Sequence, residues 1–126
     1  MAAQLAVDGV DRPRWWLWVY HWPPLGSPTC WTGKRDYGDA DLRGWLDEFG
    51  PDMVLAGHVH QSPFRPDGAW ADRIGPTWIF NPGNQIGPVP THVEIDLDVG
   101  WARWSSLLGV EKIDLAAAES PARTVF

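Results

Sequence analysis

Runs of apolar residues alternate along this chain with short stretches rich in polar residues, glycine and proline. Residues 15–20 form a continuous apolar run that is too short for a typical helix, which predicts a strand buried on both faces. Between residues 42 and 49 the apolar positions recur at spacings of three, one and three, which predicts a helix with one apolar face. Asp39 or Asp41 is suited to cap this helix, and Gly50-Pro51 is a strong stop signal.

Strand patterns return after the predicted helix. Residues 53–56 and 78–80 are short apolar runs, and residues 92–97 alternate between apolar and polar positions before a further run at 101–107. The order strand, helix, strand and then several strands predicts an α/β protein with a mixed β-sheet and a flanking helix. We expect residues 1–14 to be an irregular lead-in, residues 15–108 to form the domain, and residues 109–126 to be a loose tail.

Charge and composition exclude several classes of protein. The formal net charge of −6 argues against a nucleic-acid backbone as the main partner, because such binding needs clustered lysine and arginine. The single cysteine, Cys30, cannot form an internal disulfide. No signal-peptide pattern and no apolar run of ~20 residues is visible, so we expect a cytoplasmic protein with no membrane partner.

Tryptophan is the least ordinary feature of the composition, with 10 in 126 residues. Its side chain is large, rarely fully buried and enriched at contact surfaces. Two interpretations stay open on composition alone: a core rich in tryptophan, or an aromatic face that a partner covers.

Three of the four histidines lie at or just after predicted strand ends, with a glycine or proline within three residues: His21, His58 and His60. His58 and His60 are two residues apart, so an extended backbone would turn both imidazoles to the same side, where they can hold a metal ion. His21 ends the first strand and is followed by two prolines. In a parallel sheet with a helical crossover the two strand ends are neighbours, which would bring His21 beside His58 and His60.

Three segments together resemble the carboxyl-terminal half of the calcineurin-like metallophosphoesterase superfamily. They are His21-Trp22-Pro23-Pro24, the run 51–56 followed by Gly57-His58-Val59-His60, and the turn Asn81-Pro82-Gly83. The family carries a lone metal-binding histidine followed by two prolines, then a Gly-His-x-His motif after a strand, and often a strand closed by Asn-Pro-Gly. The resemblance covers residues 15–108 and implies half of an α/β/β/α sandwich.

The resemblance also implies roles for single residues. His21 and His58 would bind the second metal of a two-metal site, and His60 would bind the first. The implied cofactors are divalent ions such as manganese, iron or zinc, and the implied reaction is hydrolysis of a small phosphate monoester or diester by metal-activated water. The Asn-Pro-Gly segment would be a structural turn near the site. His92 matches no motif and is expected to be an exposed strand residue, and no catalytic residue is assigned.

The family's amino-terminal half supplies further ligands that do not precede His21 here. These are an Asp-x-His motif, a metal-bridging aspartate and a Gly-Asn-His motif. Without a bridging carboxylate two dications repel each other strongly, so the isolated chain is expected to hold one metal ion or none and to be a poor catalyst alone. Two other interpretations stay open. One is a truncated, non-catalytic family member that binds a metal or a protein partner through a tryptophan-rich face, and the other is a small α/β domain whose histidines have no special purpose.

The family fold packs two sheets face to face, and the resemblance implies that this chain supplies mainly the second sheet. Its inner face, with tryptophans such as Trp78, Trp101 and Trp104, would then lack its mate. We therefore expect self-association, or binding to a partner that supplies the missing half. Four basic residues could contact a phosphate, and solvated surface charge is the favoured interpretation of each: Arg65, Arg73, Lys34 and Arg35.

Overall fold

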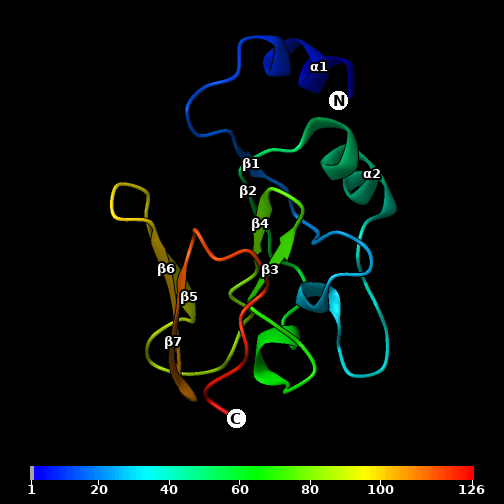
Figure 1. The fold of residues 1–126 in the computed structure, drawn as a ribbon. Helices are drawn as coiled ribbons and strands as arrows, with labels where there is room; N and C mark the ends of the chain where they lie inside the picture. Colours follow the sequence, from blue (N-terminus) through cyan, green and yellow to red (C-terminus); the bar gives the residue numbers. More distant parts are fainter. Residues whose placement is uncertain (1) are drawn as a thin grey trace.

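Two α-helices and seven β-strands make up the regular structure of residues 2–126, which the computed structural model describes (Figure 1). The helices are α1 (Ala2–Val10) and α2 (Ala40–Phe49), and Pro28–Cys30 and Ser62–Phe64 form single 3-10 turns. The strands are β1 (Leu17–Val19), β2 (Met53–Leu55), β3 (Ala71–Ile74), β4 (Thr77–Phe80), β5 (His92–Asp96), β6 (Trp101–Ser106) and β7 (Gly109–Asp114). Within residues 2–126 no helix is long and apolar enough to span a bilayer.

The first sheet has the strand order β1-β2-β4-β3. β1, β2 and β4 run parallel, and β3 returns antiparallel to β4. The register places Trp18 beside Val54 and Val54 beside Ile79. This arrangement confirms the α/β class and the mixed sheet that the order of sequence patterns predicts. It also confirms that the first two strands are parallel neighbours joined through the helix.

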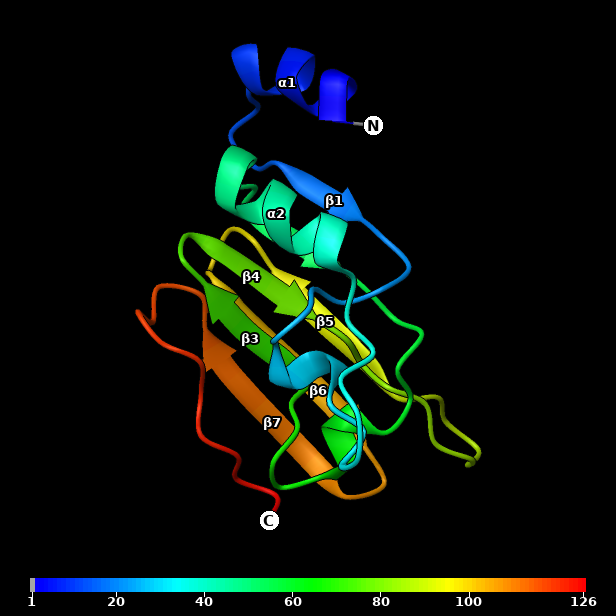
Figure 2. The ribbon, with the colours of Figure 1, turned by 90° about the vertical axis from the view of Figure 1, so that its right-hand side faces the viewer.

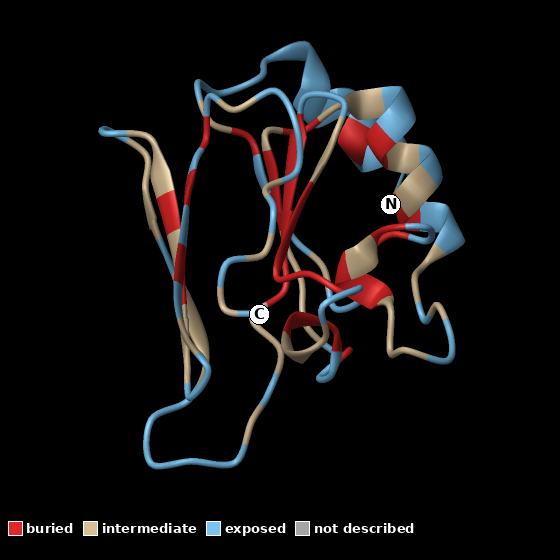
Figure 3. Cartoon of the chain, turned by 60° about the horizontal axis from the view of Figure 1, so that its bottom comes forward, coloured by how far each residue is buried: buried red, intermediate tan, exposed pale blue. Residues whose placement is uncertain are grey.

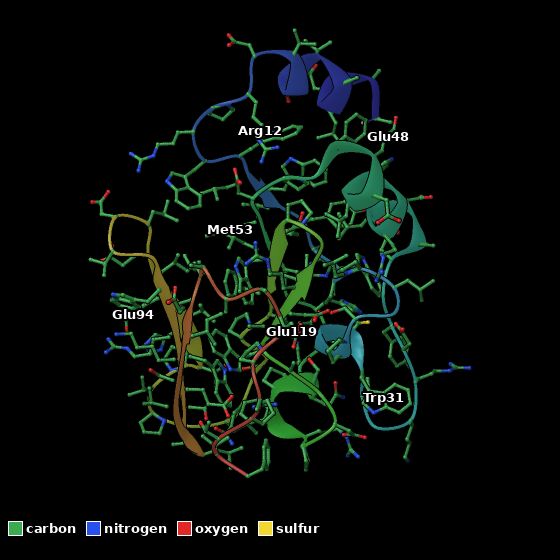
Figure 4. All side chains as sticks on the ribbon, viewed as in Figure 1. Arg12, Trp31, Glu48, Met53, Glu94 and Glu119 are labelled. Atoms are coloured by element: carbon green, nitrogen blue, oxygen red, sulfur yellow. The ribbon has the colours of Figure 1, made fainter. Side chains whose placement is uncertain are left out.

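The second sheet is an antiparallel meander with the order β5-β6-β7. It lies against one face of the first sheet, and α2 covers the opposite face, so the molecule has three layers (Figures 1 and 2). Met53 lies between the sheets (Figure 4), in a core that also contains Trp78 and Phe80 from the first sheet and Trp104 and Ile113 from the second. Burial is concentrated along the strands and along the helix side that faces them (Figure 3).

The local chemistry of α2 follows from its ends. The Asp39 side chain accepts a hydrogen bond from the Asp41 amide, and Gly50 closes the helix in the left-handed conformation. An N-cap of this kind is worth about 1 kcal/mol. The buried residues Leu42 and Leu46 pack in the second core cluster of the molecule. The predicted cap, the apolar face and the stop signal are all confirmed.

The tryptophans do not form an unpaired face. Five of them are buried within the chain: Trp16, Trp18, Trp70, Trp78 and Trp104. Trp70 stacks on Trp104 with the ring planes 10° apart, which joins the two sheets directly. The expectation that the chain supplies mainly one sheet with a bare aromatic face is therefore wrong, because strands of both sheets are present and cover each other.

The first strand is buried on one face only. Trp18 is buried on the α2 side, whereas Leu17 is 42% exposed and Val19 is 81% exposed. The sequence-based expectation of burial on both faces is wrong here. An apolar run is buried on both faces only where other elements of the fold pack on both. Here α2 packs on one face of β1, and the second sheet does not reach the other.

The first fourteen residues are not all irregular. Residues 2–10 form α1, whose one buried residue, Leu5, packs in the same cluster as Trp16 and Trp18. Gly9 does not break the helix. A Cβ atom at Gly9 would meet the Trp16 ring at 3.4 Å, an ordinary van der Waals contact, so this part of the helix lies against that ring. Alanine-rich sequence and one apolar contact outweigh a single glycine.

The carboxyl-terminal segment is not a loose tail. Residues 109–114 form β7, which pairs with β6 along its whole length. Glu111 is only 4% exposed. Its carboxylate accepts hydrogen bonds from the amides of Thr124 and Val125 and forms an ion pair with Arg123 at 2.7 Å. Burial acts to raise the pKa of Glu111, but these donors outweigh it and hold the pKa below its ordinary value. A buried ion pair thus fastens the last residues to the second sheet.

Glu111→Gln is expected to lower the free energy of unfolding at pH 7 by about 3 kcal/mol, because Arg123 loses its counter-charge in a nearly buried position. The folded pKa of Glu111 lies below the unfolded value, so its stabilisation is complete above about pH 4.5 and is lost as pH falls through the folded pKa. Urea unfolding at pH 7 and pH 3 checks this: the difference between wild type and variant should shrink at pH 3. Glu119→Gln, on the exposed carboxyl-terminal segment, is the control, and equal stability of wild type and E111Q at pH 7 would contradict the assignment.

Candidate functional site

The parallel pairing of β1 and β2 brings two histidines to one edge of the sheet. The register pairs Val19 with Leu55, so both strands end at the same level. Two further backbone hydrogen bonds extend the pairing: Tyr20 N–H donates to the Leu55 carbonyl at 3.0 Å, and Gly57 N–H donates to the His21 carbonyl at 3.1 Å. Carboxyl ends of parallel strands are where α/β sheets hold ligands.

The imidazoles of His21 and His58 face each other. His21 Nε2 lies 3.0 Å from His58 Nδ1, and the ring centroids are 4.8 Å apart. Two imidazole nitrogens that share a tetrahedral ion at the usual 2.0–2.1 Å bond length lie about 3.3 Å apart. The observed separation is therefore close to that of two ligands on one metal, and it also fits a direct imidazole hydrogen bond.

His58 adopts the left-handed conformation, with φ of 61°. It is the one non-glycine residue among the described residues with positive φ. The extended backbone from which a common orientation of His58 and His60 was expected is therefore absent at this position. Val59 N–H donates to the Gly57 carbonyl at 2.7 Å across His58, and in this tight turn the His58 ring lies against the His21 ring.

His60 lies on the wall of the neighbouring cavity. This cavity, of about 210 Å³, is lined by Thr32, Tyr37, His58, Val59, His60 and Gln61. Across residues 2–126, no three His, Cys, Asp or Glu side chains group closely enough to hold a metal ion. The fold thus brings two of the three predicted ligands into contact and leaves the third exposed nearby. Their assignment as metal ligands stays a prediction.

Trp22 is a site residue that the motif reasoning did not single out. Its ring stacks on His58 with centroids 3.6 Å apart and planes at 34°, and it meets the His21 ring edge-on at 5.9 Å. The indole therefore restricts both imidazoles. The available signal was its position in the sequence, between His21 and the two prolines.

The segment after His21 is pinned to the start of α2. Asp39 N–H donates to the Pro23 carbonyl at 2.8 Å, and Leu25 N–H donates to the Asp39 carbonyl at 3.1 Å. The Tyr20 hydroxyl donates to the Asp39 carboxylate at 2.5 Å. This hydrogen bond, with burial and the charge of Asp39, raises the pKa of Tyr20 to about 12. Tyr20 is therefore a neutral anchor near the site and not a base.

Asn81 anchors residues 57–61, here called the histidine loop, through hydrogen bonds of its side chain. Its side chain is fully buried, and Nδ2 donates to the carbonyls of Val59 at 2.8 Å and Thr29 at 2.9 Å. Its Oδ1 accepts from the Gly83 amide at 3.0 Å, which shapes the Asn-Pro-Gly turn. The turn lies next to the histidine loop, because Asn84 N–H donates to the His60 carbonyl at 3.2 Å.

The other candidate groups lie apart from the histidine pair. His92 lies on β5 with its Nδ1 2.9 Å from the Pro90 carbonyl, which confirms it as a partly exposed strand residue. Cys30 is fully buried, and burial together with a hydrogen bond to Asp36 raises the pKa of its thiol to about 12. Cys30 is therefore not a nucleophile at neutral pH.

Comparison with known proteins supports the fold and leaves the chemistry open. No family model matches the sequence, and no curated protein matches it significantly. A solved structure resembles this one with a TM-score of 0.50 over 90% of the chain, at 18% sequence identity. This chain spans 39% of the length of that protein. At such low identity the likeness concerns the fold alone.

Asn81→Asp is expected to lower the free energy of unfolding by about 3 kcal/mol, because the buried Val59 carbonyl loses its donor, the Thr29 carbonyl keeps only the Ser62 hydroxyl, and both face a carboxylate instead. Asn84→Asp makes the same chemical change at an exposed side chain and should change stability by less than about 0.5 kcal/mol. Thermal unfolding measures the two effects, and hydrogen exchange of residues 57–61 reports on the loop. Protection in N81D equal to wild type would contradict the role of Asn81 as the lock of the histidine loop.

Proposed function

We propose that this chain forms part of the active site of a calcineurin-like metallophosphoesterase, which hydrolyses a phosphate monoester or diester with metal-activated water. The observation that carries the proposal is the approach of His21 Nε2 to His58 Nδ1 at 3.0 Å, from the ends of two parallel strands. The order of the three sequence motifs adds to it. A cytoplasmic location stays a prediction of the sequence.

The donor set suits a divalent transition metal. Imidazole nitrogen is a preferred ligand of zinc, and also binds iron and related ions. A bound metal would polarise a phosphoryl oxygen and lower the pKa of a bound water. His21 and His58 would hold this ion, and Trp22 would orient the His58 ring. His60, on the cavity wall, is the residue that the family resemblance assigns to the first metal.

A second candidate function is metal binding without catalysis. It is favoured by the lack, across residues 2–126, of any group of three metal-ligating side chains. An ion held by two imidazoles needs further ligands from water, from the substrate or from another polypeptide. The two candidates differ in one measurable property, because only the first gives metal-dependent hydrolysis that is lost with the histidines.

His58→Ala and His21→Ala are each expected to weaken zinc or manganese binding by at least about 100-fold, because each removes one of the two facing nitrogens. Isothermal titration measures this, with His92→Ala as the matched control. Manganese-dependent hydrolysis of bis(p-nitrophenyl) phosphate then separates the two candidates. Equal metal affinity in H58A, H21A and H92A would contradict both.

We also propose that a further polypeptide unit extends both sheets beside β1 and β5. The carboxyl-terminal segment already covers the opposite edges: Ser120 Oγ accepts from the Arg73 amide of β3, and Glu111 of β7 binds residues 123–125. β1 and β5 are the strands at the other ends of the two sheets. In the view of Figure 2, β7 of one sheet and β3 of the other lie toward the same side of the molecule, and β5 lies toward the β1 side.

The outer edge of β1 is apolar, and no other strand within residues 2–126 pairs with it. The bonds to β2 from Trp16 and Tyr20 place alternate residues inward, so the amides and carbonyls of Leu17 and Val19 point outward. An exposed apolar edge strand is a template for another strand. The likeness to a chain of which this one spans 39% favours added strands of the same fold as the occupant.

Without that unit the chain is expected to self-associate reversibly through β1. Val19→Lys should lower the association constant by at least about tenfold, because a charge on the edge opposes strand pairing. Val99→Lys, at an exposed position in the turn after β5, should leave it unchanged. Analytical ultracentrifugation over a range of concentrations measures this, and a wild-type chain that stays monomeric with well-dispersed NMR signals would contradict the proposal.

A further inference from the structure

The cavity beside the histidines continues along the turn at residues 32–35. A second cavity, of about 510 Å³, is lined by Thr32, Lys34, Arg35, Tyr37 and Gln61. Three of these residues, Thr32, Tyr37 and Gln61, also line the 210 Å³ cavity that contains His58 and His60. The two cavities therefore adjoin. One groove runs from the imidazoles, past Tyr37, to two cationic side chains.

The turn that carries the two cations has a defined shape. Trp31 and Asp36 form an isolated antiparallel bridge, and Thr32 N–H donates to the Arg35 carbonyl at 3.0 Å. Thr32 Oγ1 accepts from the Arg35 amide at 3.1 Å. Trp31 lies on this loop at the outer edge of the molecule (Figure 4) and donates from Nε1 to Asp67. The backbone at positions 34 and 35 is thus fixed on both sides.

Gly33 makes the turn possible. Its φ is 90°, and a Cβ atom there would meet the Arg65 guanidinium at 2.1 Å. The guanidinium therefore packs directly against the glycine, while Arg65 pairs with Asp67 at 3.0 Å. Any larger residue would displace this contact and strain the backbone.

The base of the turn is anchored in the interior. The Asp36 carboxylate accepts hydrogen bonds from the amides of Gly26 and Gly38, each at 2.7 Å, and from the buried Cys30 thiol at 2.8 Å. The Asp36 carboxylate thus binds backbone amides and the Cys30 thiol, and it forms no ion pair with the neighbouring Lys34 or Arg35. Through residues 2–126, neither Lys34 nor Arg35 forms an ion pair with an acidic side chain.

We propose that this turn is the binding site for a second anionic group of the substrate. The proposal rests on the proposed function, because that function places the phosphate to be hydrolysed at the histidines. The substrate class is then a phosphate ester with another negatively charged group at its far end. The exposed ring of Tyr37 lies between the two ends of the groove and contacts the part of the substrate that joins them.

The charge balance favours this occupant. The chain carries a formal charge of −6, so its average field repels anions. Two cations without an ion pair on one rigid turn oppose that repulsion beside the cavity. Arg35 also lies over the Tyr37 ring at 5.9 Å, which keeps its guanidinium near the groove. A guanidinium and an ammonium together suit a phosphate or carboxylate group.

Inorganic pyrophosphate is the probe, titrated calorimetrically against the chain in metal-free buffer at pH 7. The double variant Lys34→Ala/Arg35→Ala is expected to bind pyrophosphate about tenfold more weakly than wild type. Arg14→Ala/Lys112→Ala, which removes two exposed cations elsewhere, has the same net charge and should bind like wild type. Inorganic phosphate, which carries less negative charge than pyrophosphate at pH 7, should show a smaller difference between the variants.

Equal weakening in both double variants, or no weakening in K34A/R35A, would overturn the proposal. Zinc titration of K34A/R35A keeps this outcome separate from the proposed function, because the histidine pair should bind the ion with unchanged affinity. Absence of zinc binding by the wild-type chain would contradict the metallophosphoesterase proposal. The pyrophosphate comparison would still decide whether the turn binds an anionic group.

Discussion

The buried amide of Asn81 is the constraint on which the histidine site depends. A carbonyl that leaves water must find a donor, or the fold loses about 1–3 kcal/mol for each one. Thr29 and Val59 belong to loops far apart in sequence, and a single side chain just after β4 donates to both carbonyls, with the Ser62 hydroxyl as a second donor to Thr29. The same amide thereby connects the loop that leads to the cationic turn with the loop that carries His58. The two ends of the groove share one buried anchor.

Much of the fold follows from signals that are local in sequence. Asp39, the apolar positions after it, and Gly50 specify α2 almost completely, because capping and periodicity act within a few residues. The crossover through α2 then makes β1 and β2 parallel neighbours, which is why the meeting of His21 and His58 could be predicted without coordinates. The handedness and adjacency rules for such units leave few alternatives.

The features that the sequence did not reveal depend on contacts between distant residues. The ion pair of Glu111 and Arg123 connects β7 to the segment after it, and no local sequence pattern indicates such a buried ion pair. The exposure of Val19 depends on which strands the second sheet contains, not on the run to which Val19 belongs. The position of His60 depends on the backbone of His58, whose left-handed conformation a His-x-His spacing does not encode.

The conformation of His58 has a consequence for how substitutions at this position trade stability against chemistry. A β-carbon in the left-handed region costs about 1 kcal/mol, and glycine is the residue that avoids this strain. Selection for thermal stability alone would therefore favour glycine after Gly57, at the loss of the imidazole that faces His21. In a stability-based library the histidine at 58 is among the first residues to disappear, and only a screen for binding or turnover retains it.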